Sequence, residues 1–300
     1  MNSLSLQLSE VEELVLEILE HCDIASLVAA SHGNQQFRRL ARSVLSTCLV
    51  HALKPSIPDF LLLQFFTLLD HTESAIVGST ILKTVTPHCT WETGNLNIVA
   101  PLYAFSLWED FFTMHRFIAS IDDTFGHLQN NTHQAGVWYH DESKHTKKII
   151  VVESADDSVF LPILSSPLSS QMNIITSSHL YCLYPTLTAD GISVNSFSGL
   201  PHSFNTVPVV LSDTRLEVVK NQGLQFYANG ERPDKACGVE CPKIEWALKG
   251  YRNVGIFHWG GYRLMKETTM DPISAYQCSF LWSLGRECCN QFCPRSILNV

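Results

Sequence analysis

The stretch from Ala75 to Pro101, AIVGSTILKTVTPHCTWETGNLNIVAP, constrains the fold of this chain more than any other. Its β-branched start at Ala75–Val77 predicts a short strand, and Gly78-Ser79 predicts a tight turn. A short helix then leads to a second strand over Leu96–Val99, which is entered as Asn95-Leu96-Asn97. Side chains two residues apart on a strand lie on the same face. The stretch therefore predicts two amide side chains on one face of a strand, close to a glycine turn.

Composition indicates a globular protein with a substantial core. The chain has 300 residues, of which 45% are apolar and only 16% are charged. Such a length can bury a large core without disulfides or metals. The net charge of −9, without any basic run longer than two residues, argues against nucleic acid as a partner, because binding to phosphate backbones needs clusters of Lys and Arg.

Neither a secretory signal nor a membrane span is expected. The N-terminal segment MNSLSLQLSE lacks a basic start and an apolar core. The longest apolar run, Phe60–Leu69, is much shorter than the roughly 20 residues that a membrane-spanning helix needs. We therefore expect a cytoplasmic or nuclear protein, in which cysteines are thiols or metal ligands rather than disulfides.

Residues 9–50 predict three short helices. Ser9 and Glu12 form a capping-box pattern, Asp23 is expected to cap the second helix, and Gly33-Asn34 is expected to break the chain before a third helix that begins near Gln35. The pattern VEELVLEILEHCDIASLVAASHGNQQFRRLARSVL resembles an F-box, although the proline usually found near the start of that motif is missing. The matching residues are Leu14, Ile18, Leu19, Leu27, Val28, Phe37 and Leu40.

The F-box resemblance implies that this prefix docks a Skp-type adaptor protein. Leu14 and Ile18 are the residues expected to contact it, through apolar helix faces. The alternative is a helical prefix that packs on the core of the protein and binds no adaptor.

The remaining chain alternates between helical and strand periodicity. We predict helices at Asp59–Leu69, Phe105–Ile121 and Leu211–Asn221, and strands at Ile149–Val152 and Val159–Leu164. Strands interleaved with helices favour a mixed α/β (α+β) core. The predicted organisation is a helical bundle over residues 1–54, an α/β core over 55–230 and a cysteine-rich segment over 231–300.

The order Val77-Gly78-Ser79, helical spacer, Asn95-Leu96-Asn97-Ile98 resembles the nucleotidyltransferase pattern. In that family two carboxylates on one strand share a pair of Mg²⁺ ions, and the Gly-Ser turn brings backbone N–H groups close to the phosphates. Later segments resemble nucleotidyltransferase-like proteins common in fungi, and the likeness extends from Ser74 to Tyr227. These segments are KKIIVV at 147–152, SSQMN at 169–173, YPTLT at 184–188 and VVKNQGLQFY at 218–227.

The departures from that pattern predict a protein without catalysis. Asn95 and Asn97 stand where the family has metal-binding carboxylates, and a neutral amide cannot offset the charge of Mg²⁺. We therefore expect no Mg–nucleotide cofactor and a binding or scaffold role, including that of an F-box-type substrate adaptor. Gly78 and Ser79 are candidates for nucleotide binding, with a purely structural turn as the alternative.

The competing hypothesis is an active, metal-dependent nucleotidyltransferase with displaced carboxylates. Glu153 is the candidate third carboxylate. The alternative, without a role in catalysis, is that Glu153 is a solvent-exposed residue at the end of its strand. Asp122, Asp123 and Asp156 are the other acids that such an enzyme would have available.

Six of the ten cysteines lie after residue 236. Two pairs share a three-residue spacer and a following proline, and together they offer four thiolates for a structural Zn²⁺. The four predicted ligands are Cys237, Cys241, Cys289 and Cys293. The alternatives are buried free thiols without metal and, at the level of the whole protein, a structural zinc-stabilised module.

Between these cysteine pairs, GIFHWGG at 255–261 predicts a strand and a tight turn. His258 is expected to be a half-exposed strand residue or, alternatively, a metal ligand. Trp246, Trp259 and Trp282 are expected to form a local core.

Overall fold

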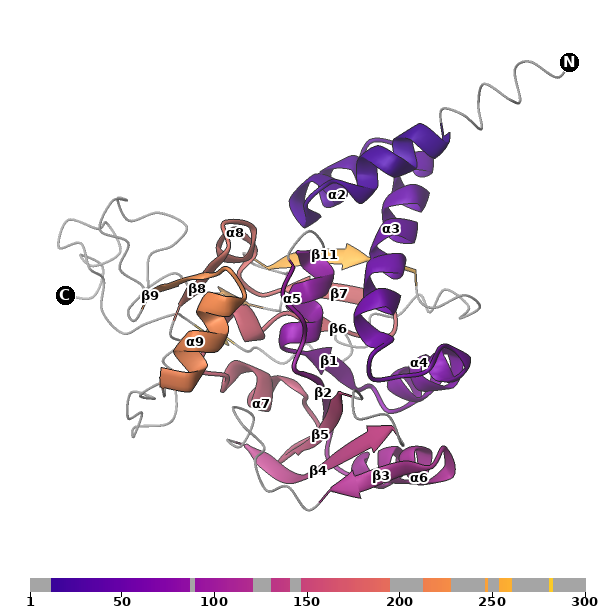
Figure 1. Cartoon of the computed structure of the whole chain (residues 1–300), viewed down its shortest axis with the longest axis vertical. Coiled ribbons are helices and arrows are strands. Elements are labelled where there is room, and N and C mark those ends of the chain that lie inside the picture. The colour runs from indigo at the N-terminus through magenta and orange to yellow at the C-terminus, as the bar shows by residue number, and fades with distance from the viewer. Residues whose placement is uncertain are drawn as a thin grey trace, which may run out of the picture.

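A mixed sheet forms the centre of the molecule (Figure 1). The computed structural model describes residues 12–86, 90–120, 131–140, 147–194, 213–227, 246–247, 254–260 and 281–282. Over this part of the chain, eight strands pair in the order β11-β7-β6-β1-β2-β5-β4-β3. In chain order they are β1 (Ala75–Val77), β2 (Asn95–Ala100), β3 (Phe117–Ser120), β4 (Thr132–His140), β5 (Lys148–Ser154), β6 (Ile174–Ile175), β7 (His179–Cys182) and β11 (Gly255–His258).

The pairing within this sheet is antiparallel except between β2 and β5, which run parallel. Two shorter pairs lie outside it: β8 (Ile192–Val194) with β9 (Gln225–Tyr227), and β10 (Trp246–Ala247) with β12 (Leu281–Trp282). The predicted mixed α/β fold is thus confirmed.

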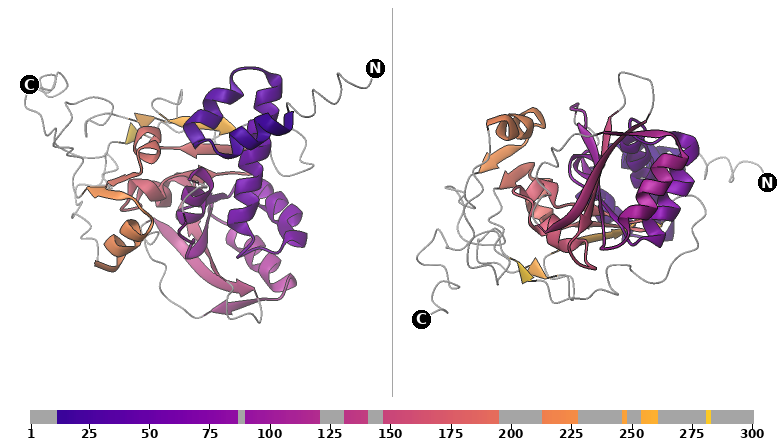
Figure 2. Two further views of the ribbon diagram at one scale, coloured as in Figure 1. Left: turned by 45° about the horizontal axis from the view of Figure 1, so that its top comes forward. Right: turned by 90° about the horizontal axis from the view of Figure 1, so that it is seen from below.

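Helices cover both faces of the sheet (Figure 2). Residues 12–20 are helical. The α-helices that follow are α2 (Ile24–Ser31), α3 (Gln35–Leu53), α4 (Leu62–His71), α5 (Ser79–Val85), α6 (Phe105–Met114), α7 (Phe160–Leu164), α8 (Pro185–Ala189) and α9 (Asp213–Asn221). The described residues also form two 3₁₀ turns, η1 (Asp59–Leu61) and η3 (Ser169–Gln171). Helices α3 to α6 pack on one face through the larger hydrophobic cluster, and α7 and α8 pack on the other.

The N-terminal helices begin where the local sequence predicts. The Asp23 side chain accepts a hydrogen bond from the N–H of Ser26 at the start of α2, and Asn34 accepts one from Phe37 at the start of α3. The apolar face of α3 belongs to the same hydrophobic cluster as the sheet. The helical segment and the α/β core therefore share one hydrophobic core instead of forming separate ones.

Two predicted elements are wrong. The helix predicted over Phe105–Ile121 ends at Met114, because Arg116 adopts a left-handed backbone (φ +62°) and the chain then pairs with β4 as strand β3. The strand predicted over Val159–Leu164 is helix α7. Its Pro162 lies in the first turn, where a proline N–H is not needed.

The C-terminal segment contributes an edge strand to the central sheet. Strand β11 pairs with β7, so the predicted strand in GIFHWGG is confirmed, and His258 is partly exposed as expected. Trp259 is buried in the larger cluster against Phe66 of α4, with ring centroids 5.5 Å apart. It therefore belongs to the main core rather than to a local tryptophan core. None of the helices that the structure describes has both the length and the apolar character of a membrane span.

Candidate functional site

The predicted strand–turn–helix–strand unit is present, and it brings the Gly78 turn after β1 next to the start of β2. Strand β1 pairs antiparallel with β2, so that Val77 lies opposite Asn97. Gly78 follows β1 with a left-handed backbone (φ +79°), and α5 starts at the next residue, the half-buried Ser79. The hydroxyl of Thr80 donates to the carbonyl of Asn95 over 3.1 Å, which ties the first turn of α5 to the start of β2.

The side-chain amides of Asn95 and Asn97 are hydrogen-bonded to each other on one face of β2. The Asn95 Nδ2 atom donates to Asn97 Oδ1 over 2.7 Å, and the Asn97 side chain is only 2% exposed. The Asn97 amide also stands directly against Gly78, where an added Cβ would lie 2.7 Å from Asn97 Nδ2. Gly78 is therefore required for two reasons, its positive φ and the close approach of this amide.

The neighbouring strand β5 presents no acidic side chain to this amide pair, because Lys148 lies opposite Asn95 and apolar residues alternate after it on the same face. Asn97 lies opposite Ile150 of β5, and Ile150 and Val152 pack in the same cluster as Val77 and Val99. A two-metal site needs several anionic oxygens on one face. On this face of β2 and β5, the described residues offer two neutral amides, a lysine and aliphatic side chains, and no carboxylate.

Glu153 lies on the opposite face of the sheet. Side chains alternate along a strand, and Glu153 pairs with Ala100, which faces the larger cluster with α6. Its Oε1 accepts the N–H of Phe105 at the start of α6 over 3.0 Å, which suits a carboxylate because a helix N-terminus is partially positive. Its Oε2 lies 2.7 Å from His133 Nδ1 and accepts from Gln134 Nε2 over 2.9 Å.

These contacts correct both interpretations of Glu153. It is 1% exposed, so it is not a solvated strand end. It points away from Asn97, so it cannot complete a metal site there. The pattern Ile149, Val151, Glu153 already places the glutamate on one face with two buried residues, and this was the signal that could have found it. Its partners His133 and Gln134 carry no signal in the sequence.

The other candidate acids do not join the amide pair in the described part of the chain. Asp156 Oδ1 accepts hydrogen bonds from Ser158 N and Ser154 Oγ, in the loop that follows β5. Asp122 and Asp123 lie outside the described residues. Among the described residues, no three His, Cys, Asp or Glu side chains are grouped so that they could hold a metal ion.

The predicted adaptor-binding residues are exposed. Leu14 is 58% exposed and Ile18 is 64% exposed, one helical turn apart within the helix at residues 12–20. In contrast, Leu19, Leu27 and Leu40 are buried in the core. The helix thus buries one side and leaves an apolar pair on another.

The four predicted zinc ligands lie outside the described residues, so the zinc site stays a prediction. Three cysteines are described as free thiols: Cys22, Cys48 and Cys182. Burial raises the pKa of the Cys182 thiol to about 11, against smaller opposing effects of hydrogen bonds from Thr188 and the Tyr184 backbone. Such a thiol is a packing group rather than a nucleophile.

Comparison with known proteins gives a distant structural similarity only. No family model and no curated protein sequence matches the chain. The CCA-adding enzyme in complex with CTP aligns with 48% of this chain and 34% of its own length, at 11% identity and a TM-score of 0.34. The CCA-adding enzyme in complex with ATP aligns with 48% of this chain and 35% of its own, at 11% identity and a TM-score of 0.33. The chain thus spans about a third of the length of these enzymes.

Proposed function

We propose that this protein is a non-catalytic, nucleotidyltransferase-like binding or scaffold protein. One observation carries the proposal: the amides of Asn95 and Asn97 are bonded to each other beside Gly78, where an active enzyme would need two carboxylates facing a metal pair. The oxygen of Asn97 is engaged by Asn95, and its nitrogen stands against the glycine turn. A neutral, self-paired amide is a poor ligand for Mg²⁺.

The surroundings of the pair support the same conclusion. Ile150 and Val152 occupy the positions of β5 from which a third carboxylate would reach Asn97, and Glu153 is committed to the start of α6 on the other face. An enzyme with displaced carboxylates would need acids on the face of Asn97. The described strands supply none there.

Calorimetry with ATP or CTP in the presence of Mg²⁺, together with a pyrophosphate-release assay in Mg²⁺ and Mn²⁺, tests this proposal. We expect neither heat nor pyrophosphate from the wild-type chain. Pyrophosphate release that requires a divalent cation would overturn the proposal. Aspartate-to-asparagine variants at positions 122 and 123 would then show whether those two carboxylates supply the missing ligands.

The exposed pair Leu14 and Ile18 favours a second candidate function, docking of a Skp-type adaptor. Large apolar side chains on one helix face are the usual anchors for binding in a partner groove. Leu14→Asp and Ile18→Asp place charges in that contact, and we expect each to weaken co-purification with the adaptor about tenfold or more. Met114→Asp is the matched control, because Met114 is 75% exposed at the end of α6. Capture that is equally strong in all variants would remove the adaptor role.

A further inference from the structure

Glu153 and His133 form a carboxylate–imidazole pair at a distance from the amide pair. Glu153 is 1% exposed, and its Oε2 lies 2.7 Å from His133 Nδ1. The His133 side chain is 57% exposed, so the ring contacts a buried carboxylate while much of its surface faces solvent. Glu153 lies opposite Ala100 on the parallel strand β2, at the other end of that strand from Asn95.

A β-bulge brings the His133 ring to this carboxylate. Strand β4 shifts register between Thr132 and Gln134, so that His133 is the extra residue. Neighbouring side chains on a regular strand point to opposite faces, yet His133 and Gln134 both contact Oε2 of Glu153. Bulges redirect side chains in this way and are frequent next to functional sites. The backbone of β4 thus departs from regular pairing at the residue that holds the ring against the carboxylate.

The contacts of Glu153 determine which nitrogen of His133 carries the ring proton. The two oxygens of Glu153 accept from the N–H of Phe105 and from Gln134 Nε2. A carboxylate has no proton to donate, so Nδ1 of His133 donates to it, and in the neutral ring the unshared electron pair lies on Nε2. Among the described residues, none is bonded to Nε2. The ring is therefore held at one nitrogen and presents an electron pair at the other.

A carboxylate bonded to one nitrogen of an imidazole makes the other nitrogen a better electron-pair donor. When Nε2 forms a bond to an electrophile, the ring becomes positively charged, and the carboxylate at Nδ1 stabilises that charge. A histidine that is oriented by such a partner can form covalent intermediates. No hydroxyl or thiol of a described residue is bonded to Nε2, so the ring has no second nucleophile to activate.

We propose that His133 is a nucleophilic site that accepts an acyl group on Nε2 from an activated acyl donor. The electron pair of Nε2 forms a bond to the carbonyl carbon of the donor. The bond between that carbon and the leaving oxygen breaks, and the leaving group departs with the electron pair. The product is an N-acylimidazolium whose Nδ1 proton stays in the hydrogen bond to Glu153. This modification does not depend on the role proposed for Asn95 and Asn97.

The charges near the pair favour a neutral acyl donor over an anionic one. Asp156 and Asp157 follow β5 within four residues of Glu153, and Asp157 is exposed. Like charges repel at short range, so these carboxylates disfavour a donor that carries a phosphate or a carboxylate. A neutral ester or anhydride meets no such repulsion.

The loop between β2 and α6 borders the same pair. The N–H of Leu102 donates to the carbonyl of Asp156 over 3.0 Å, and the N–H of Phe105 donates to Glu153. Between them, Tyr103 is 80% exposed and has a left-handed backbone (φ +71°). A bulky residue in this conformation is uncommon, and such residues cluster at active sites and ligand sites. An exposed aromatic side chain in this loop suits an acyl donor with an apolar part.

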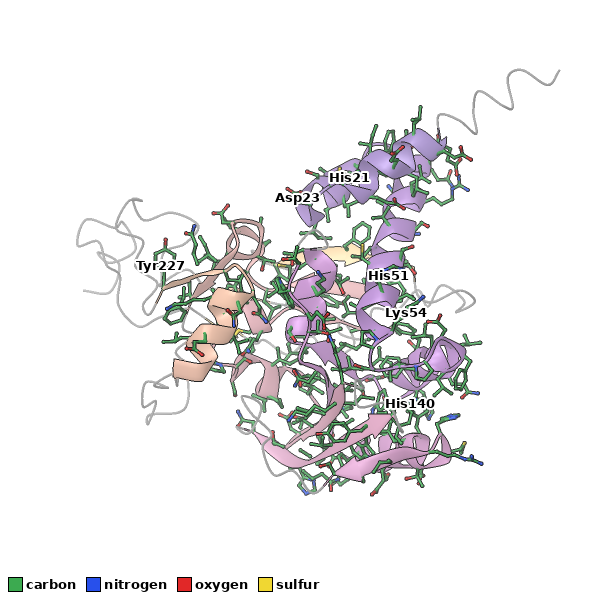
Figure 3. All side chains as sticks on the ribbon, viewed as in Figure 1. His21, Asp23, His51, Lys54, His140 and Tyr227 are labelled. Carbon is green, nitrogen blue, oxygen red and sulfur yellow. The ribbon has the colours of Figure 1, made fainter. Side chains whose placement is uncertain are left out.

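Acylation of the full-length protein with diethyl pyrocarbonate, a neutral acyl donor, tests the proposal. Peptide mass spectrometry reads the rate at each histidine separately. At pH 8 we expect His133 to be modified at least about tenfold faster than His51. His51 is the internal reference, because it is exposed on α3 (Figure 3) and no described residue is bonded to its ring. Equal rates at the two histidines would overturn the proposal.

Two variants separate the bonded carboxylate from the general negative charge of the region. Glu153→Gln removes the charge behind the ring and should slow the modification of His133 to the rate of His51. Asp156→Asn removes a nearby charge and keeps the Oδ1 acceptor for the N–H of Ser158, so the rate at His133 should not change. A rate that Glu153→Gln leaves unchanged, or that Asp156→Asn lowers equally, would refute the proposal.

Nitrogen NMR of the histidine rings in the wild-type protein decides the matter if Glu153→Gln does not fold. At pH 8 we expect His133 to carry its proton on Nδ1 and none on Nε2. A proton on Nε2 of His133 would remove the electron pair that the proposal requires and would overturn it. His140, at the other end of β4 (Figure 3), is the reference within the same strand.

Discussion

The double variant Asn95→Asp/Asn97→Asp should lose up to about 4 kcal/mol of folding stability at pH 7 and regain most of it near pH 4. These substitutions keep the size of both side chains and introduce carboxylates, the side chains that a two-metal site needs. They change only the charge at a contact where the structure places Nδ2 of one amide 2.7 Å from Oδ1 of the other.

The magnitude follows from that distance. Two carboxylates 2.7 Å apart repel by about 6 kcal/mol at an effective dielectric constant of about 20. Protonating one aspartate at pH 7 requires less free energy, about 4 kcal/mol, because the ordinary pKa of aspartate is about 3.9. A protonated carboxyl can also donate to its neighbour and restore the lost hydrogen bond. The folded variant should therefore hold one proton, which sets the ceiling on the loss.

The pH dependence has a definite sign. The shared proton raises the pKa of one aspartate in the folded state above its unfolded value. The deficit relative to wild type is then absent below about pH 4 and grows by up to about 1.4 kcal/mol per pH unit as the pH rises toward 7. Urea denaturation at pH 4.5, 5.5 and 7 measures it.

Both single variants are needed to isolate the interaction. In Asn97→Asp the new carboxylate still accepts from Asn95, and in Asn95→Asp a flipped Asn97 amide can donate. Each single substitution should therefore destabilise the fold much less than the double substitution. In a double-mutant cycle, most of the loss should appear as the coupling energy between the two positions. If the double variant is simply additive to within about 0.5 kcal/mol, or its deficit does not change with pH, the two side chains do not meet. Mn²⁺ that stabilises the double variant and not the wild type would support descent from a metal-binding site.

Four further outcomes are expected. Gly78→Ala should destabilise the fold by about 1–3 kcal/mol, because Gly78 has φ +79° and an added Cβ would lie 2.7 Å from Asn97 Nδ2; Gly94→Ala, with no atom within 4 Å of its added Cβ, is the control for thermal melting. Glu153→Gln replaces one carboxylate oxygen by an NH₂ group, which cannot accept from the three donors on Phe105, His133 and Gln134. Urea denaturation should show a loss of about 1–3 kcal/mol of folding stability. The raised pKa of Cys182, about 11 instead of 9.0, means that folding stability should fall by about 3 kcal/mol as the pH rises from about 9 to 11; Cys182→Ala should remove that fall, and an unchanged alkaline profile would contradict it. Metal analysis of the purified chain should find one zinc per molecule, which is lost when the four C-terminal cysteines are replaced by serine; a metal-free wild type would eliminate the predicted site.

The sequence predicted the amide pair because its signals are local. A β-branched triplet, a glycine and two asparagines two positions apart specify a strand, a turn and a shared face without reference to distant residues. The caps at Asp23 and Asn34 were predictable for the same reason, since each side chain bonds a backbone N–H three residues ahead.

The errors arose where an apolar run fits both helix and strand. Phe117–Ser120 continues the apparent helical period of α6, and it becomes a strand because β4 offers it a partner. Val159–Leu164 is rich in residues that suit strands, and it becomes helix α7 packed on the sheet. Periodicity in short apolar segments does not decide between the two, and the available partner does.

By itself the sequence determined the unit around Gly78 and the neutral chemistry of Asn95 and Asn97, because both depend on residue type and on spacing of a few positions. Only the tertiary structure decided which surroundings those residues meet. Strand pairing set Ile150 opposite Asn97, turned Glu153 to the other face to bind the start of α6, and brought Arg42 to His258. Such contacts depend on which strands become neighbours and in which register, and no local hydrogen-bonding preference specifies that.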